Sequence, residues 1–314
     1  MTTPVYLDCD TGIDDSLALL YLLRSPEVAL VGIGTVSGNI DAATAARNTL
    51  DLVALAGREV PVAVGEHDPR VGSYAGGAPH VHGTDGIGGV SLPRATSEPE
   101  AESAAQMLVR LAGEHDGALE VLAVGPLTNL AAALDLDPTL PSKVRRVVVM
   151  GGAAQTSGNV SAVSEANIHN DPEAAAAVVD APWDVVLVPL DVTLENRFTE
   201  EDQSALLDSA DPAAQAIGRM LDQYFTFYQG VYGFRGCALH DPLAAAILVG
   251  EIEATRAPAV PVVVDATQGP GRGQTLCDLR HQRSGIADVP GAHVRVVLDT
   301  ERPLGPVLRA RLVG

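Results

Sequence analysis

Short runs of apolar, largely β-branched residues recur along this 314-residue chain, with stretches of helical periodicity between them. Near-continuous apolar strands of this kind are typical of a parallel sheet that is covered by helices on both faces. The alternation therefore predicts an α/β fold, doubly wound, with a mainly parallel sheet and a Rossmann-like core. The predicted strands cover residues 4–10, 29–36, 60–65, 119–125, 145–152, 184–192, 260–265 and 293–299, and the predicted helices include 14–24, 41–56, 101–114 and 171–179.

The organisation of the chain favours a single domain over residues 1–314. Hydrophobic residues make up 46% and charged residues 19%, and no linker or fixed-period repeat divides the sequence. Two segments depart from the alternating pattern. Residues 65–89 are rich in glycine and lack periodicity, which indicates either a mobile loop that closes over a site or a solvated excursion. Residues 199–250 are predicted to be mainly helical.

The charge balance bears on the partners of the protein. Forty acidic against twenty basic residues give a formal net charge of −20, which would repel nucleic-acid phosphates and anionic membrane surfaces alike. The three cysteines are widely spaced, so neither a disulfide framework nor a CxxC zinc site is expected. The first residues, "MTTPVYLDCD", lack the features of a signal peptide, and no apolar run reaches the ~18 residues of a membrane helix. We therefore expect a cytoplasmic protein without nucleic-acid or membrane partners.

Four aspartates crowd the end of the first predicted strand, in "DCDTGIDD". Ligands of open parallel sheets bind outside the carboxyl ends of the strands, which is where Asp8, Asp10, Asp14 and Asp15 fall. Two carboxylates at 4 Å repel by about 4 kcal/mol at an effective dielectric of 20, more than the ~0.3–1 kcal/mol that a helix dipole returns. A cation resolves this repulsion, and oxygen ligands suit Ca²⁺ or Mg²⁺ rather than zinc. The alternative, strongest for Asp8, is that some of these residues only cap the strand and the helix.

Further polar groups follow the other predicted strands. Singly, an asparagine in a loop makes a turn and a histidine is a satisfied core or surface group, but together they suit a polyol such as a sugar. The groups concerned are Asn39, the segment from Val124 to Asn129, Asn159, Glu165, Asn167, His169, His240 and Asp241. Three tyrosines at helical spacing, Tyr224, Tyr228 and Tyr232, form either a core stripe or a face that lines an aromatic ligand.

Eight sequence blocks, in order, resemble the inosine–uridine-preferring nucleoside hydrolase family. The blocks are "DCDTGIDD", "SGN", "HGTDGIGG", "GPLTNLA", "VVVMGGA", "GN…EANIHNDPEAA", "PLDVT" and "LHDPLAA". The resemblance runs from about residue 4 to the end of the helix that begins at "HDP" and is weaker beyond it. The chain departs from the usual family pattern at Thr11 and Ala166, and neither position matches a family ligand.

The resemblance implies a nucleoside hydrolase-like domain that cleaves the N-glycosidic bond of purine or pyrimidine ribonucleosides, giving ribose and a free base, with one bound Ca²⁺. Family metal ligands match Asp10, Asp15, the carbonyl of Val124 and Asp241. Family ribose contacts match Asp14, Asn39, Asn159, Glu165 and Asn167. His240 matches a residue near the leaving base, and His82, Tyr224, Tyr228 and Tyr232 fall in segments that close over it. The family also implies a homodimer or homotetramer.

The chemistry of these residues is consistent with that reaction. Glycoside cleavage passes through an oxocarbenium-like transition state, which carboxylates around the ribose would stabilise. A metal lowers the pKa of a bound water, which attacks the anomeric carbon while Asp10 accepts its proton as general base. His240 is the best-placed acid for the leaving base, with a tyrosine as a second candidate.

Two other functions stay open at this stage. A phosphatase of the haloacid dehalogenase type would use Asp8 as nucleophile, but Gly12 stands where its motif has Thr or Val, and Lys143 is the sole lysine. A non-catalytic, calcium-dependent nucleoside- or ribose-binding protein would share most contacts of the hydrolase. Asp10 and His240 separate the two, since binding alone needs neither a base nor an acid.

Overall fold

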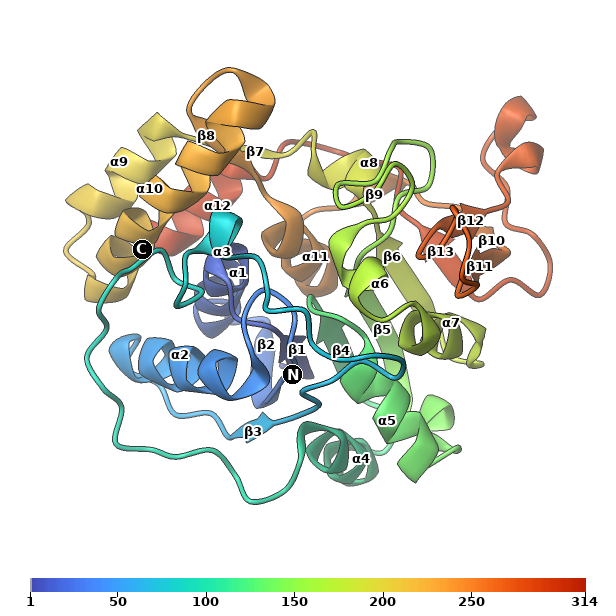
Figure 1. Cartoon of the computed structure of the whole chain (residues 1–314), viewed down its shortest axis with the longest axis horizontal. Coiled ribbons are helices and arrows are strands. Elements are labelled where there is room, and N and C mark those ends of the chain that lie inside the picture. Colours follow the sequence, from blue (N-terminus) through green and yellow to red (C-terminus); the bar gives the residue numbers. More distant parts are fainter. Residues whose placement is uncertain (1) are drawn as a thin grey trace.

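The computed structural model describes residues 2–314, without the side chains of Arg283 and Ser284. An eight-stranded sheet lies at the centre of the protein (Figure 1). Its strand order is β10-β13-β6-β5-β4-β1-β2-β3, and all neighbours are parallel except β10 and β13. The strands are β1 Thr3–Cys9, β2 Val28–Thr35, β3 Val62–Val64, β4 Leu119–Ala123, β5 Val144–Met150, β6 Val185–Val188, β10 Ala259–Val260 and β13 Val294–Val296. The strand order reverses between β1 and β4, which confirms the doubly wound fold and marks the crevice where such folds bind ligands.

Helices cover both faces of this sheet (Figure 1). The helices are α1 Ile13–Leu23, α2 Ala42–Leu55, α3 Pro79–His82, α4 Ala104–His115, α5 Thr128–Leu136, α6 Ala166–Asn170, α7 Pro172–Asp180, α8 Leu190–Thr193, α9 Glu200–Asp208, α10 Pro212–Tyr232, α11 His240–Val249 and α12 Gly305–Val313. Short 3₁₀ turns lie at Leu140–Ser142 and Arg280–Ser284. Across residues 2–314, no helix is both long enough and apolar enough to cross a membrane.

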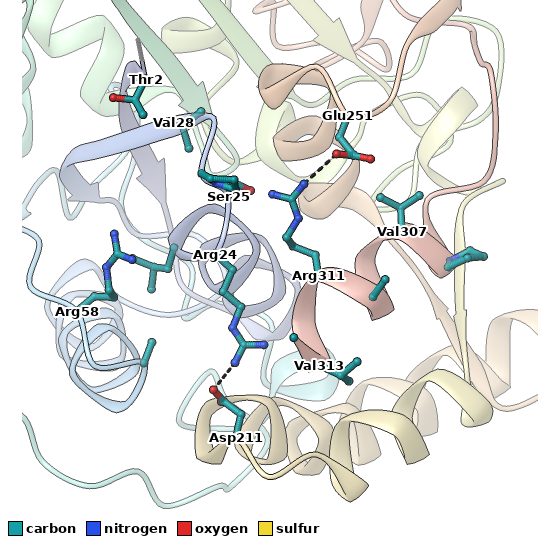
Figure 2. Close-up of a pocket in the computed structure, with 16 residues that line it drawn as sticks. Thr2, Arg24, Ser25, Val28, Arg58, Asp211, Glu251, Val307, Arg311 and Val313 are labelled. Atoms are coloured by element: carbon teal, nitrogen blue, oxygen red, sulfur yellow. Dashed lines mark hydrogen bonds and ion pairs between the residues drawn. The ribbon is translucent and has the colours of Figure 1, made fainter.

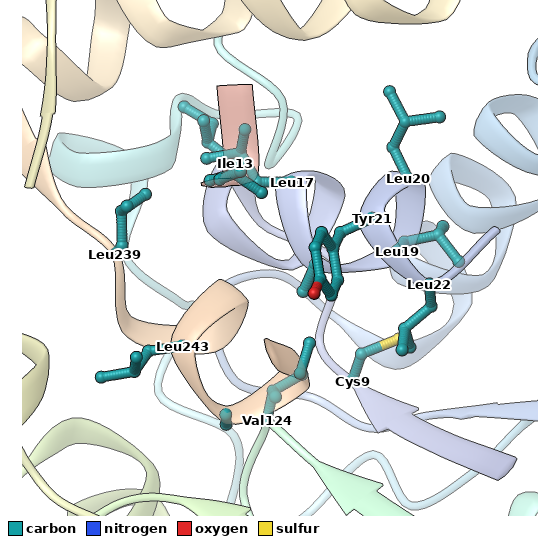
Figure 3. Close-up of a cluster of buried hydrophobic side chains, with 14 of the residues drawn as sticks. Cys9, Ile13, Leu17, Leu19, Leu20, Tyr21, Leu22, Val124, Leu239 and Leu243 are labelled. Carbon is teal, nitrogen blue, oxygen red and sulfur yellow. The ribbon is translucent and has the colours of Figure 1, made fainter. Parts of the chain in front are cut away.

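The two faces bury separate hydrophobic cores, because side chains alternate along each strand. On one face, Cys9 of β1 packs with Leu17 and Tyr21 of α1 and Leu243 of α11, as Figure 3 shows. On the other face, Tyr6 of β1 packs with residues of α4, α5 and α7. The end of β1 is thus held from both sides, which fixes the position of the aspartates that follow it.

The structure divides two of the predicted strands. Residues 184–192 are not one strand: β6 ends at Val188, and "LDVT" forms α8, because Pro189 has no N–H for the sheet and its carbonyl accepts from Thr193 N. Residues 260–265 are divided at Pro261: β10 joins the sheet, whereas β11 Val262–Val264 pairs with β12 Thr275–Cys277 in a separate hairpin.

Two predicted segments contain short elements that the sequence did not predict. The segment 65–89, predicted to lack secondary structure, contains α3, which starts at Pro79 as proline favours. The mainly helical segment 199–250 also contains β8 Gly236–Ala238, which pairs with β7 Arg197–Thr199. One more strand pair, β9 Ala254–Arg256 with β14 Asp299–Thr300, lies near the carboxyl end of the chain.

A wide cavity of about 1190 Å³ lies at the amino ends of β1 and β2, between the end of α1 and α12. Ion pairs of Arg24 with Asp211 and of Arg311 with Glu251 span it (Figure 2). Because it lies at the amino ends of the strands, it is separate from the aspartates, which follow the carboxyl end of β1.

Candidate active site

The turn between β1 and α1 is organised by Asp15. Its carboxylate accepts hydrogen bonds from the backbone N–H of Asp10 at 3.1 Å and of Gly12 at 2.8 Å. Glycine is required at residue 12 because the side chains of His82 and Asn39 approach its backbone closely. A Cβ at this residue would lie 2.7 Å from Nδ1 of His82 and 2.8 Å from Nδ2 of Asn39. The turn therefore brings Asp10, Asp15 and Asn39 together at the carboxyl end of β1.

Carboxylates from two distant segments meet at this point. Oxygens of Asp14, Asp15 and Asp241 all lie within 4.8 Å of one another, and all three residues are buried. Asp241 arrives on the first turn of α11. Asn39, at the end of β2, donates from its backbone N–H to Asp10 Oδ2 at 2.6 Å and from its amide to Asp15 Oδ2 at 3.2 Å. The predicted ligands Asp15 and Asp241 are thus adjacent, with Asp10 alongside, and Asp14 belongs to the same cluster.

The electrostatics of the cluster favour a cation. Burial, together with the neighbouring carboxylates, raises the pKa of Asp10 and of Asp241 well above the usual range and that of Asp15 to about 6. Within the described part of the chain, the buried Oδ1 of Asp14 has no hydrogen-bond partner. A cation among these oxygens would lower all these pKa values, because it favours the charged carboxylates. The donor set, all oxygen, fits a hard divalent ion.

Groups from β4 and α6 border the cluster. The Asn167 amide donates to the carbonyl of Val124 at 2.8 Å and to that of Met150 at 3.1 Å. A carbonyl has two lone pairs, so that of Val124 can still accept a metal. Glu165 caps α6, accepting from the N–H groups of Asn167 and Gly152, each at 2.9 Å, and burial raises its pKa to about 7. Asn159 is exposed on the loop between β5 and α6, and its ribose contact stays a prediction.

His240 lies in a chain of hydroxyl groups. Its Nδ1 is 2.8 Å from the Thr193 hydroxyl and its Nε2 is 2.6 Å from the Tyr228 hydroxyl. Burial is the largest cause of a lowered pKa, so the imidazole is neutral near pH 7. A neutral imidazole has one donor and one acceptor, which the two hydroxyl groups match.

The tyrosines of α10 form a core stripe, one of the two roles open from the sequence, and their contact with an aromatic ligand stays a prediction. Tyr224 and Tyr228 are buried and pack edge-to-face with ring centroids 5.0 Å apart, so they belong to the core. Tyr224 also donates to Asp14 Oδ2 at 3.0 Å, which ties the stripe to the acidic cluster. Tyr232 stacks on Tyr228 at 5.2 Å and is partly exposed.

His82 closes the cluster from α3. Its Nδ1 accepts from the backbone N–H of Ile13 at 3.1 Å and lies 3.9 Å from Asp14 Oδ1. Its ring packs on Tyr224 with centroids 5.4 Å apart, and burial lowers its pKa to about 3. The segment 65–89 thus reaches the site through His82.

The Asp8 side chain contacts Asn129 and Tyr6 and does not join the cluster of Asp14, Asp15 and Asp241. Its Oδ1 accepts from the Asn129 amide at 2.8 Å and, more weakly, from the Tyr6 hydroxyl at 3.4 Å, and burial raises its pKa to about 7. Asn129 also binds the Thr35 carbonyl at 3.0 Å and the Glu66 N–H at 2.8 Å. Asp8 therefore supports the start of the loop after β3. A fully buried carboxylate in this position is not placed to act as a phosphatase nucleophile.

Sequence reasoning missed Thr193, which contacts His240. It named Asn129 among the polar groups but missed that its amide holds Asp8. Both lie in blocks already noted, "PLDVT" and "GPLTN", but the tertiary contact of each hydroxyl or amide cannot be read from spacing.

Comparison with known proteins agrees with this geometry. A sequence model of the family described as "Inosine-uridine preferring nucleoside hydrolase" matches residues 5–304. The chain is 41% identical over 273 residues to "Probable uridine nucleosidase 1" of Oryza sativa subsp. japonica, covering 87% of this chain and 84% of that protein. It is 36% identical to the "Pyrimidine-specific ribonucleoside hydrolase RihA" of Enterobacter sp. (strain 638), covering 79% and 80%.

Two solved structures share the whole fold. A plant nucleoside hydrolase, PpNRh1, has a TM-score of 0.91 at 31% identity, with 100% of this chain and 98% of that one covered. A purine-preferring ribonucleoside hydrolase from Gardnerella vaginalis has a TM-score of 0.89 at 32% identity, with 99% and 96% covered. This chain belongs to the inosine-uridine preferring nucleoside hydrolase family, and it is a glycosidase of N-glycosyl compounds that hydrolyses ribonucleosides.

Proposed function

We propose that this enzyme is a Ca²⁺-dependent hydrolase of pyrimidine ribonucleosides, with uridine as a good substrate. The observation that carries the proposal is the buried cluster of Asp14, Asp15 and Asp241 beside Asp10, facing a neutral His240 that is bonded to Tyr228. One side of this arrangement can hold a cation and a sugar diol, and the other can deliver a proton to a base.

Asp10, Asp15, Asp241 and the carbonyl of Val124 would hold the metal. Oxygen ligands around a site that also takes sugar hydroxyls favour Ca²⁺, which accepts six to eight oxygens, over Mg²⁺, which retains its waters. The bound ion would supply a water of lowered pKa and would bind the ribose diol.

The protein's own residues supply the remaining chemistry. Asp10 accepts the proton of the attacking water, while the amide and N–H of Asn39 hold its carboxylate in place. Ribose hydroxyls are bound by Asp14, Asn39, Asn159, Glu165 and Asn167. The carboxylates of Asp14 and Glu165 stabilise the oxocarbenium-like transition state. His240 is neutral at rest, so it donates a proton to the leaving base from the protonated fraction of its imidazole, with Tyr228 bonded to its Nε2. His82, Tyr224 and Tyr232 enclose the base.

The base preference is proposed from the relatives named above. Two sequence relatives, at 41% and 36% identity, are named for uridine or pyrimidine substrates, whereas the purine-preferring structure is 32% identical. The enzyme is further proposed to work in the cytoplasm. It is also proposed to be a homodimer or homotetramer, and light scattering on the purified protein would measure this oligomeric state.

The test is a kcat/KM panel over uridine, cytidine, inosine, adenosine and guanosine, with wild type and Asp10→Asn. We expect uridine to exceed the purine nucleosides at least tenfold, and Asp10→Asn to lose nearly all turnover of each. Faster hydrolysis of inosine than uridine would refute the pyrimidine preference, and a fully active Asp10→Asn would refute the role of Asp10.

A further inference from the structure

Three aromatic rings lie in a row at the end of α10 and in the turn after it, and they form an aromatic stack of Tyr228, Tyr232 and Phe234. The ring centroids of Tyr228 and Tyr232 are 5.2 Å apart with planes at 20°, and those of Tyr232 and Phe234 are 5.4 Å apart with planes at 13°. At the inner end, the Tyr228 hydroxyl lies 2.6 Å from His240 Nε2. At the outer end, Phe234 is 39% exposed. The aromatic stack therefore runs from the proposed acid to the surface.

Side-chain hydrogen bonding does not fix Tyr232, the middle ring of the aromatic stack. Among residues 2–314, its buried hydroxyl has no hydrogen-bond partner. A buried tyrosine hydroxyl usually finds a partner that fixes the orientation of the ring. The helix also ends here, since Gly233 follows in a left-handed conformation with φ of +75°. The position of the Tyr232 ring must therefore depend on the groups that pack against it.

The guanidinium of Arg197 packs against both outer rings. Its Cζ lies 4.8 Å from the ring centroid of Tyr232 and 5.5 Å from that of Phe234. Both distances are within the range of about 6 Å over which a cation is attracted to an aromatic ring. A guanidinium is also planar, so it stacks on aromatic rings as a lysine ammonium cannot. One charged group thus holds the two outer rings together.

The backbone that carries Arg197 is fixed relative to His240. Arg197 begins β7, which pairs with β8 beside the end of α10 (Figure 1). In this pair Arg197 lies opposite Ala238, which is two residues before His240. On the other side of Arg197 in the sequence, Thr193 contacts Nδ1 of His240. The side chain of Arg197 can therefore hold the aromatic stack in place relative to His240.

We infer that Arg197 is a positioning residue for nucleoside binding, because it fastens Tyr232 and Phe234 against Tyr228 and keeps the aromatic wall of the base site closed beside His240. This inference rests on the proposed function, in which Tyr232 helps to enclose the base. Without the guanidinium, the outer rings would populate open positions. The apparent affinity for a nucleoside would then fall with the fraction of enzyme that stays closed.

The expected effect is confined to the base, because the proposed ribose contacts Asp14 and Glu165 come from α1 and from the N-cap of α6. The test variant is Arg197→Ala in the full-length enzyme with Ca²⁺. Its KM for uridine should rise about five- to tenfold with kcat nearly unchanged, whereas the inhibition constant of ribose, which lacks a base, should stay within about twofold of wild type. Thermal melts confirm that the variant is folded.

Two further variants separate the contact with the rings from the charge. Arg197→Lys keeps a cation near the rings but has no planar group, so its KM for uridine should lie between those of wild type and Arg197→Ala. Arg219→Ala removes an equal charge from an exposed position on α10 and should keep wild-type kinetics. An equal rise in KM in Arg219→Ala would overturn the inference, as would a parallel rise in the ribose inhibition constant of Arg197→Ala.

Hydrogen exchange tests the contact without turnover. In Arg197→Ala, the amides of residues 229–236 should exchange at least about fivefold faster than in wild type, with those of α11 unchanged. Unchanged exchange over 229–236, or an unchanged KM for uridine, would overturn the role of Arg197 and leave the hydrolase intact. Failure of the wild type to cleave uridine would count against the proposed function, and the exchange rates would still decide whether Arg197 holds the aromatic stack.

Discussion

His240 is the residue whose surroundings say most about how the leaving base departs. It is buried, neutral near pH 7 and bonded through both ring nitrogens, to the hydroxyl groups of Thr193 and Tyr228, so it is held in one orientation. Such an acid matters only when the leaving group needs protonation.

His240→Ala should therefore slow hydrolysis according to the leaving group. We expect a loss of ~10²–10⁴ in kcat for uridine, the range typical of general acid catalysis. A p-nitrophenyl riboside, whose phenolate leaves without a proton, should lose far less. Steady-state kinetics with both substrates measure this difference, and equal losses for the two would assign the acid role elsewhere.

Asp8 and Glu165 contribute to the way the stability of the metal-free protein depends on pH, in the same direction as the carboxyl groups of the acidic cluster. Both are buried, and in the folded protein the pKa of each is raised to about 7 from 3.8 and 4.5. The folded state thus binds these protons more tightly than the unfolded chain does. The resulting stabilisation is complete below about pH 4 and is lost as pH rises through 7.

We accordingly expect the Tm of the metal-free protein to decrease as pH rises from 5.5 to 8. The corresponding loss in the free energy of unfolding is about 2 kcal/mol or more. Calorimetric melts of the chelator-treated protein across this pH range measure the change in Tm. Asp8→Asn, which keeps an oxygen for the Asn129 amide, is the control and should show a smaller fall. A Tm that rises over this range would contradict the assignment.

At the scale of elements, α8 links the two halves of the site. Asp191 accepts from the N–H groups of Ala154 at 2.7 Å and Gln155 at 2.7 Å, so it orders the loop that leads to Glu165. Two residues on, Thr193 binds His240. One short helix therefore positions both the loop that leads to Glu165, proposed to bind the sugar, and His240, the proposed acid.

Thr193→Val tests this link, since it keeps the shape of the side chain and removes the hydroxyl. A lost hydrogen bond of about 1 kcal/mol corresponds to roughly five- to tenfold in kcat for uridine. Thr193→Ser should restore the rate, and hydrolysis of the p-nitrophenyl riboside should be unaffected. Wild-type kinetics on uridine in Thr193→Val would show that the contact with His240 is incidental.

The observed helices and strands, compared with the predicted ones, show how much of the fold could be predicted from the sequence. The strands of the parallel sheet were predictable because burial on both faces imposes near-continuous apolar runs, as in β1 and β5. The strand predicted over 184–192 was wrong at its end, because "LDVT" is as β-branched as a strand and only Pro189 signals the break. Asp10, Asp14 and Asp15 were predictable as a group because they are close in sequence. Asp241 could be named from the sequence only as one polar group among several, and its role as a metal ligand entered through the family resemblance. The contacts of Thr193 and Asn129 depend on tertiary packing.

For the whole molecule, the strand order places the site at the point between β1 and β4 where the connections diverge to opposite faces. One face contributes α10 and α11, with the acid and the aromatic rings, and the other contributes the loop after β3 and the start of α5. The acidic cluster lies between them, and it is half complete until α11 adds Asp241. We propose that this cluster holds one catalytically required Ca²⁺ ion.

That claim is tested most directly by titrating Ca²⁺ into chelator-stripped enzyme, following heat by calorimetry and uridine hydrolysis in the same samples. We predict one ion per chain, with activity returning in proportion to occupancy, and at least a hundredfold weaker binding in Asp241→Asn. Full activity in the stripped enzyme, with no binding heat, would contradict the account.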